Sequence, residues 1–108
     1  MAINFLEIFE KTRHCPHMYF GCYSIIRFHS YIYGYLFAAT QVDEKNRIYV
    51  INLGRFNKWL AQKYSIKDML GWDTILLIES NNDDEAALEL FWKEWDEFVL
   101  TQKSDSSE

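Results

Sequence analysis

Apolar side chains recur along most of the chain at intervals of three and four residues, the spacing that places them on one face of an α-helix. The pattern predicts a first helix over residues 3–13, ending before Cys15 and Pro16, because the residue preceding a proline avoids helical torsion angles. A second helix is predicted over residues 25–40, with Ser24 as its N-cap. Its apolar stripe consists of Ile25, Phe28, Ile32, Tyr35, Leu36 and Ala39.

The middle of the chain has a mixed pattern. Residues 48–51 favour β structure, but they have no obvious pairing partner, so we interpret them as the approach to a third helix capped by Asn52. The inward residues of that helix are expected to be Phe56, Trp59, Leu60 and Tyr64. Ser65 is then expected to cap a short element that ends near Gly71. Residues 72–79 favour another helix, with a buried strand as the alternative.

The last helix has the clearest pattern. Asn82 and Glu85 have the spacing of a capping box, and acidic residues favour a helix N-terminus. The apolar face that follows consists of Leu88, Phe91, Trp92, Trp95, Phe98 and Val99.

Together these elements predict an all-α fold, a compact single-domain bundle of about five helices. The helical domain is expected to cover residues 1–100, and residues 101–108 are expected to form a flexible acidic tail. The alternative is an α+β fold with a small sheet made from residues 48–51 and 74–78.

Composition adds an excess of aromatic residues to this picture. Eight Phe, seven Tyr and four Trp make up 18% of the 108 residues, so some rings are expected to face a partner. Only two cysteines occur, Cys15 and Cys22, and free buried thiols are favoured over a disulfide. The chain shows neither a secretory signal nor an apolar stretch long enough to span a membrane, so a cytoplasmic protein is expected.

Charge is distributed unevenly along the chain. The formal net charge is −5, which argues against direct nucleic-acid binding, because neutralising phosphates requires a basic surface. Residues 1–78 carry nine basic and six acidic groups, a net of +3, whereas residues 79–108 carry two basic and ten acidic groups, a net of −8. The last helix therefore presents either a solvated acidic face or an electrostatic surface for a basic partner.

Candidate catalytic chemistry is sparse. His14, Cys15, His17 and Cys22 are close in sequence, but their spacing fits no zinc-binding pattern. A Cys–His nucleophile from Cys15 or Cys22, or an acid–base pair of His14 with His29, lacks the accompanying residues that an active site needs. No glycine-rich phosphate loop is present either. We expect no catalytic, cofactor-binding or metal-binding residues, and no enzymatic activity.

A set of short motifs resembles a known family. These motifs are Pro16-x-Met18-Tyr19-Phe20-Gly21, Ser24-Ile25, the aromatic run from Tyr31 to Ala38, Phe56-x-x-Trp59-Leu60 with Lys63-Tyr64, Gly71-Trp72, and the acidic-aromatic stretch from Glu85 to Phe98. In this order they resemble small bacterial immunity proteins that accompany polymorphic toxins, including those of contact-dependent growth inhibition. His17 departs from the pattern, which usually has a glycine after the proline.

The resemblance implies a cytoplasmic protein that binds the C-terminal domain of its cognate toxin and neutralises it by stoichiometric inhibition, without a reaction of its own. Many such toxins are nucleases with basic, phosphate-binding clefts, which suits an acidic inhibitor acting as a monomer in a 1:1 complex. The alternatives are a homo-oligomeric adaptor that buries its extra aromatic rings against itself, and a small enzyme dependent on His and Cys.

The residues of the partner-binding surface are predicted from the charge and aromatic patterns, not from the resemblance. Five acidic residues lie on the last helix and two on the connection before the third helix, while three tyrosines lie off the main stripes. They are Glu85, Glu89, Glu94, Asp96, Glu97, Asp43, Glu44, Tyr23, Tyr31 and Tyr33.

Overall fold

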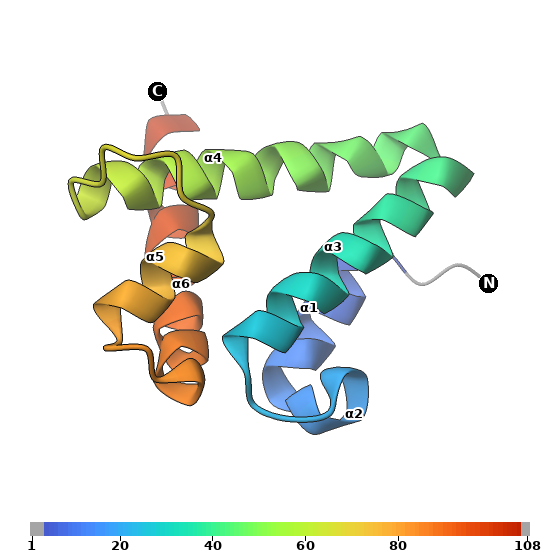
Figure 1. The fold of residues 1–108 in the computed structure, drawn as a ribbon. Coiled ribbons are helices and arrows are strands. Elements are labelled where there is room, and N and C mark those ends of the chain that lie inside the picture. Colours follow the sequence, from blue (N-terminus) through green and yellow to red (C-terminus); the bar gives the residue numbers. More distant parts are fainter. Residues whose placement is uncertain (1–3, 107–108) are drawn as a thin grey trace.

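Six α-helices and one 3-10 turn make up the fold over the residues that the structure describes (Figure 1). The computed structural model describes the backbone of residues 4–106 and the side chains of residues 4–103. The elements are α1 (Phe5–His14), α2 (Pro16–Phe20), α3 (Ile25–Val42), the 3-10 turn η1 (Glu44–Asn46), α4 (Arg47–Lys63), α5 (Trp72–Glu79) and α6 (Asp84–Ser106). No strand occurs between residues 4 and 106, so the all-α prediction is confirmed and the α+β alternative is wrong.

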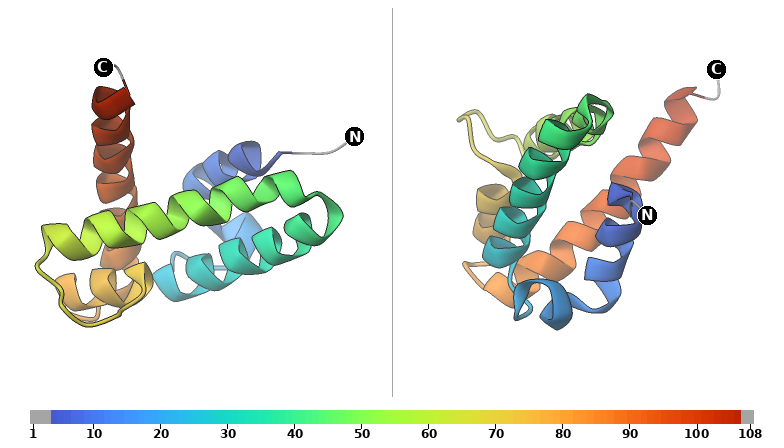
Figure 2. Two further views of the ribbon diagram at one scale, coloured as in Figure 1. Left: turned by 90° about the horizontal axis from the view of Figure 1, so that it is seen from above. Right: turned by 90° about the vertical axis from the view of Figure 1, so that its right-hand side faces the viewer.

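The helices form a flattened globule with principal extents of 41 × 40 × 24 Å. Helices α3 and α4 form a hairpin through η1, and α6 runs across α4 and passes beyond it towards the C-terminus (Figure 2). Helix α5 fills the space between α4 and α6, while α1 and α2 cover the other end of the molecule. Within the described residues, no helix combines the length and apolar character needed to cross a membrane.

The core is organised around the ring of Phe91, which is fully buried in α6. Its centroid lies 4.9 Å from those of Phe28 in α3 and Trp72 in α5. It also lies 5.4 Å from that of Phe56 in α4 and 6.1 Å from that of Phe9 in α1. Aromatic pairs are favourable at separations of about 4.5–7 Å, so one side chain holds five helices together. We call these five rings the aromatic hub.

Helix α2 is an element that the apolar pattern did not predict. It contains five residues. Pro16 fits its first position, because the N–H that proline lacks would be unpaired there. Gly21 ends it with a φ of 89°, a conformation that side chains other than glycine rarely adopt. This positive φ explains the glycine that ends the Pro16–Gly21 motif.

Helix α4 begins earlier than predicted. Asp43 accepts a hydrogen bond from the backbone N–H of Lys45 and so starts η1, which leads directly into α4 at Arg47. Residues 48–51 are helical, and Asn52 lies inside the helix rather than capping it. Tertiary packing overrides the β preference of this segment, since the ring of Tyr49 lies 4.9 Å from that of Phe5.

The segment after α4 is a loop instead of the short helical element predicted after Ser65. Ser65 has a φ of 56°, and the backbone N–H of Ile66 donates back to the carbonyl of Ala61, which closes the end of α4. The side-chain amide of Asn57 donates to the carbonyl of Leu70 at 2.9 Å and holds the loop against α4. Apolar periodicity does not predict a positive φ at a residue other than glycine.

Both ends of the last helix also differ from the prediction. Asn82 has a φ of 63° and lies before the helix, while Asp83 caps it by accepting the backbone N–H of Ala86 at 3.0 Å. At the other end α6 continues to Ser106, so the tail predicted to begin at residue 101 is helical over most of its length. Residues 107–108 lie outside the described residues, as do residues 1–3, where the first predicted helix would begin.

Removing the central ring tests the importance of the aromatic hub. Phe91→Ala is expected to lower the free energy of unfolding by about 3–5 kcal/mol, because rings on four other helices would face a cavity. Urea denaturation followed by circular dichroism measures the change. Leu100→Ala is the matched control, because Leu100 is on the same helix but 66% exposed, and its effect should stay within about 0.5 kcal/mol. Equal losses in the two variants would contradict a central role for Phe91.

Candidate functional site

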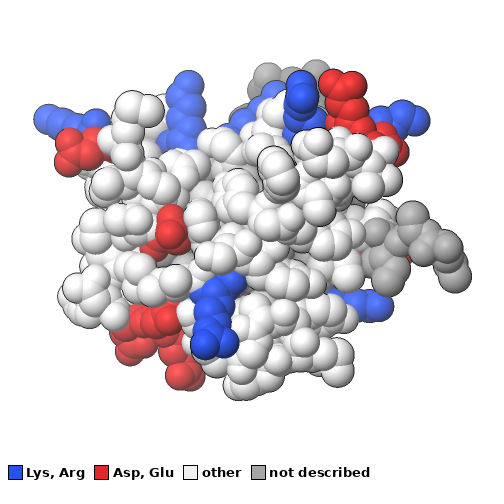
Figure 3. All heavy atoms as spheres, turned by 45° about the vertical axis from the view of Figure 1, so that its right-hand side comes forward, with Lys and Arg blue, Asp and Glu red and all other residues white. Residues whose placement is uncertain are grey.

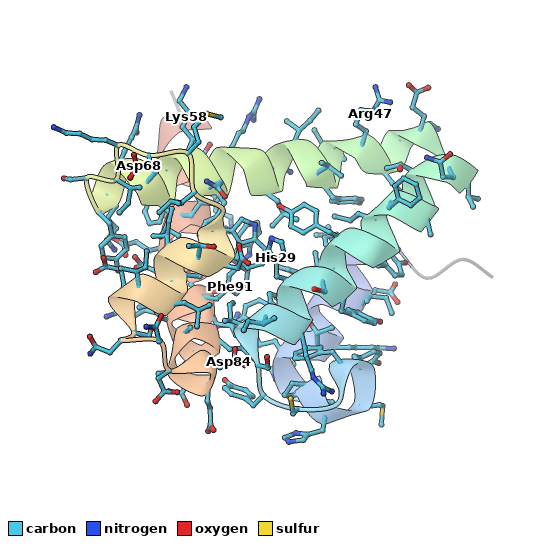
Figure 4. The ribbon with its side chains drawn as sticks, in the orientation of Figure 1. His29, Arg47, Lys58, Asp68, Asp84 and Phe91 are labelled. Atoms are coloured by element: carbon cyan, nitrogen blue, oxygen red, sulfur yellow. The ribbon has the colours of Figure 1, made fainter. Side chains whose placement is uncertain are left out.

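Four carboxylates gather where α6 begins, next to the first turn of α3. We call Asp83, Asp84, Glu85 and Glu89 the acidic end. In Figure 4, Asp84 lies between the N-terminal ends of α3 and α6. Acidic side chains are favoured there, because the unpaired N–H groups at a helix N-terminus carry partial positive charge. The acidic end therefore follows from helix electrostatics as well as from the composition of this segment.

Asp84 has a structural role within the acidic end. Its Oδ2 accepts a hydrogen bond from the hydroxyl of Ser24 at 2.6 Å, and its Oδ1 accepts the backbone N–H of Ile26 at 3.2 Å. The same Ser24 hydroxyl accepts the backbone N–H of Arg27, which confirms the predicted cap of α3. One carboxylate thus joins the beginnings of two helices.

Glu85 and Glu89 instead face solvent. Neither forms a hydrogen bond or an ion pair with any residue that the structure describes, and both side chains are exposed. Tyr23 is half-buried beside them. Burial raises the pKa of Tyr23, and the negative charges of Glu89 and Glu85 raise it further. The structure therefore brings together three of the residues predicted to bind a partner.

Glu94 was predicted to lie on the partner-binding surface, but its side chain is only 1% exposed. It occupies the same helical stripe as Ala87, Phe91 and Phe98, all of them buried. Its Oε1 lies 2.7 Å from Nζ of Lys63, on α4, while its buried Oε2 has no hydrogen-bond partner among the described residues. Glu94 is thus part of the core and not available to a partner in this conformation.

Lys63 also pairs with Glu97, whose carboxylate lies 2.6 Å from the ammonium group. Burial lowers the pKa of Lys63, but the hydrogen bonds with Glu94 and Glu97 outweigh this effect and raise it to about 12. The hydrogen bond with Lys63 lowers the pKa of Glu97 in turn. The positive charge that compensates Glu94 and Glu97 therefore comes from α4. The charges of α6 alone do not predict this pairing.

Asp96 is likewise paired with a residue of another helix, although its side chain is 51% exposed. Its two carboxylate oxygens accept hydrogen bonds of 3.0 and 2.5 Å from the guanidinium of Arg13, on α1. This guanidinium also lies over the ring of Trp92, 4.8 Å from its centroid. A bidentate pair of this kind fixes the orientation of both side chains. Asp96 therefore links α1 to α6 and is not a free carboxylate.

The remaining predicted residues lie elsewhere. Asp43 and Glu44 belong to the turn between α3 and α4, where Asp43 caps η1 and Glu44 lies 3.7 Å from Arg47. Tyr31 is half-buried and its ring centroid lies 6.1 Å from that of Phe20. The hydroxyl of Tyr33 accepts the indole N–H of Trp72 at 2.9 Å. None of these four belongs to the acidic end.

Figure 3 shows one face of the molecule with a largely uncharged middle, basic and acidic side chains along its upper edge, and further acidic side chains at lower left. An apolar hollow lies between α3 and α4, lined in part by Tyr33, Phe37 and Val50. Phe37 is 71% exposed there. The predictions did not include this hollow, although an aromatic residue off the apolar stripe of α3 is a signal for it.

His29 lies close to the same region. Its ring centroid is 4.7 Å from those of Tyr33 and Trp72, and its Nε2 is 3.5 Å from Oδ1 of Asp73. Burial lowers the pKa of His29, while the charge of Asp73 acts in the opposite direction. Such a pair can orient an imidazole for proton transfer. His14 was not expected to act as its acid–base partner, and Nε2 of His14 lies 3.9 Å from Oε2 of Glu10.

The cysteines and the other potential metal ligands of the described residues do not form a metal site. Cys15 is exposed and Cys22 is half-buried, and both are free thiols. The prediction of free thiols is therefore confirmed, although Cys15 is not buried. Among the described residues, no three His, Cys, Asp or Glu side chains are grouped in a way that could hold a metal ion.

Comparison with known proteins adds no family to these observations. No protein-family model matches the chain, and searches of curated proteins and of solved structures find no significant match. What the acidic end and the hollow between α3 and α4 can bind therefore follows from their own geometry and charge.

The environment of Tyr64 predicts a loss of stability in alkaline solution. Burial, together with the neighbouring Glu94 carboxylate, raises the pKa of Tyr64 to about 12, compared with about 10 in an unfolded chain. A raised pKa in the folded state stabilises the fold fully below about pH 10, and this contribution is lost as the pH rises towards 12. The free energy of unfolding, measured in urea across this range, should therefore fall less steeply in Tyr64→Phe than in the wild type. Parallel pH profiles would contradict the prediction.

Proposed function

We propose that the protein is an immunity protein, which binds a cognate toxin domain and neutralises it stoichiometrically without catalysing a reaction. The proposal rests on one observation: Glu85 and Glu89 are exposed and form no ion pair or hydrogen bond within the described part of the chain. Their neighbours on α6, Glu94, Asp96 and Glu97, have counter-charges on other helices. The net negative charge of α6 is thus open to an external cation mainly at the acidic end.

The chemistry of this surface suits a basic protein partner. Unpaired carboxylates attract a positively charged cleft and orient it during encounter. The half-buried Tyr23 beside them adds an aromatic side chain of the type that contributes most to interface affinity. A nuclease toxin with a phosphate-binding cleft is such a partner. The inhibitor would act in the cytoplasm, as a monomer in a 1:1 complex, and would compete with nucleic acid for the toxin.

Charge reversal at the acidic end tests the proposal. The partner tested is the C-terminal domain of the protein encoded next to this gene, and its affinity is measured by isothermal titration calorimetry alongside inhibition of its activity. Glu85→Lys combined with Glu89→Lys is expected to weaken binding by at least about tenfold, because it replaces attraction with repulsion. Inhibition should weaken in parallel.

Glu7→Lys combined with Asp68→Lys is the matched control. It makes the same change in net charge at two exposed residues outside the acidic end, whose side chains form no ion pair with the described residues. The control should retain nearly wild-type affinity. If both double variants bind alike, only overall charge matters and the acidic end is not the binding surface. If the neighbouring protein neither binds nor is inhibited, the immunity proposal itself is wrong.

A homo-oligomeric adaptor is the second candidate function, favoured by the apolar hollow between α3 and α4. Phe37 is 71% exposed and Val50 37% exposed, so a second copy could bury both. Light scattering at micromolar concentration distinguishes the cases. An adaptor is expected to have a multiple of the 13.0 kDa chain mass, reduced to a single chain by Phe37→Glu. A monomer mass for the wild type excludes this candidate.

A further inference from the structure

Two adjoining hollows form a groove where α4 crosses α6, away from the acidic end. The first has a volume of about 370 Å³, and the second shares three of its lining residues, Arg55, Phe98 and Gln102. We call the combined feature the α4–α6 groove. It is bounded by Arg55, Lys58 and Trp59 of α4 and by Trp95, Phe98 and Gln102 of α6.

The floor of the groove is aromatic. Phe98 is 5% exposed, and its ring centroid lies 5.6 Å from that of Trp59 and 5.5 Å from that of Trp95. Both tryptophans are half-buried, and the ammonium group of Lys63 lies over the ring of Trp59, 5.3 Å from its centroid. A floor of this kind offers a preformed apolar contact for a leucine or phenylalanine side chain.

The rim of the groove is cationic. Arg55 and Lys58 are exposed and form no hydrogen bond or ion pair with the residues that the structure describes. Figure 4 shows Lys58 on the outer edge of α4, pointing away from the bundle. No Asp or Glu lines either hollow, although the surrounding part of the chain is strongly acidic. The unpaired positive charge therefore calls for an anionic occupant.

We propose that the α4–α6 groove binds an acidic peptide segment of a partner protein. Carboxylates of the segment pair with Arg55 and Lys58, and an apolar side chain between them packs on Phe98 and Trp95. This surface goes beyond the proposed inhibitory function, because its charge is opposite to that of the acidic end. It gives the protein a second partner surface on the same helix.

The shape and charge of the groove favour a peptide over other anions. The groove is open along its length, whereas sites for small molecules usually enclose most of the ligand. A nucleic-acid-binding protein contacts about six to ten phosphates. The two unpaired cations of the groove, on a protein with a net charge of −5, would neutralise only a small part of that charge. A peptide with a few carboxylates and one or two apolar side chains matches the groove in both respects.

A synthetic peptide of alternating glutamate and leucine tests this proposal without requiring the natural partner. It is titrated into the full-length, ¹⁵N-labelled protein, and the indole N–H signals of Trp59 and Trp95 are followed by NMR. The expected result is a saturable shift of both signals that weakens as salt is added. A peptide with glutamine in place of glutamate should bind at least about tenfold more weakly. Equal binding of the two peptides, or no shift at millimolar peptide, overturns the proposal.

Variants locate the binding and separate it from general charge effects. Arg55→Glu combined with Lys58→Glu is expected to weaken binding of the glutamate peptide by at least about tenfold. Lys45→Glu combined with Lys67→Glu makes the same charge change at exposed residues outside the groove and should have little effect. Equal loss in both double variants overturns the site. Tighter binding of a single-stranded oligonucleotide, with shifts of the same indole signals, would assign the groove to nucleic acid instead. These measurements do not involve the acidic end, so they succeed or fail independently of the immunity proposal.

Discussion

The packing of five helices around the ring of Phe91 is the constraint on which the rest of the structure depends. Because this ring must point into the hub, the rotation of α6 about its own axis is fixed, and with it the direction of every charge on that helix. Glu85 and Glu89 are turned outward, whereas Glu94, three residues after Phe91, is turned inward. The buried pair between Glu94 and Lys63 is thus a consequence of aromatic packing. A carboxylate on this stripe has to be compensated, since an unpaired buried charge is strongly destabilising.

Apolar periodicity was sufficient to predict four of the six α-helices of the described residues, because their packing repeats the spacing of one helical face. It predicted α1, α3, α5 and α6 close to their observed positions. It failed where single residues set the backbone. Ser65 and Asn82 adopt positive φ, and Asp43 starts a 3-10 turn, and all three outcomes depend on hydrogen bonds that a pattern of apolar residues does not record.

The pairing of the candidate binding residues within the fold could not be predicted from the sequence, for a related reason. Composition identified α6 as acidic, but the partners of Asp96 and Glu97 are Arg13 and Lys63, which are remote in sequence. A charge count along the chain cannot separate a paired carboxylate from a free one. For Glu94, a helical projection alone would have been sufficient, because it shares a stripe with Phe91 and Phe98. The spacing was visible in the sequence, although the counter-charge was not.

Helix α6 also determines how far apart the two charged surfaces lie. It runs unbroken over 23 residues, and at a rise of about 1.5 Å per residue Glu85 in the acidic end and Phe98 in the α4–α6 groove are separated along the helix axis by roughly 20 Å. At physiological ionic strength electrostatic influence decays over about 8 Å. A cation bound at one end and an anion bound at the other would therefore hardly sense one another through solvent. The length of α6 thus keeps the two charged surfaces electrostatically independent, so the charge of a partner at one surface would not weaken the attraction of a partner to the other.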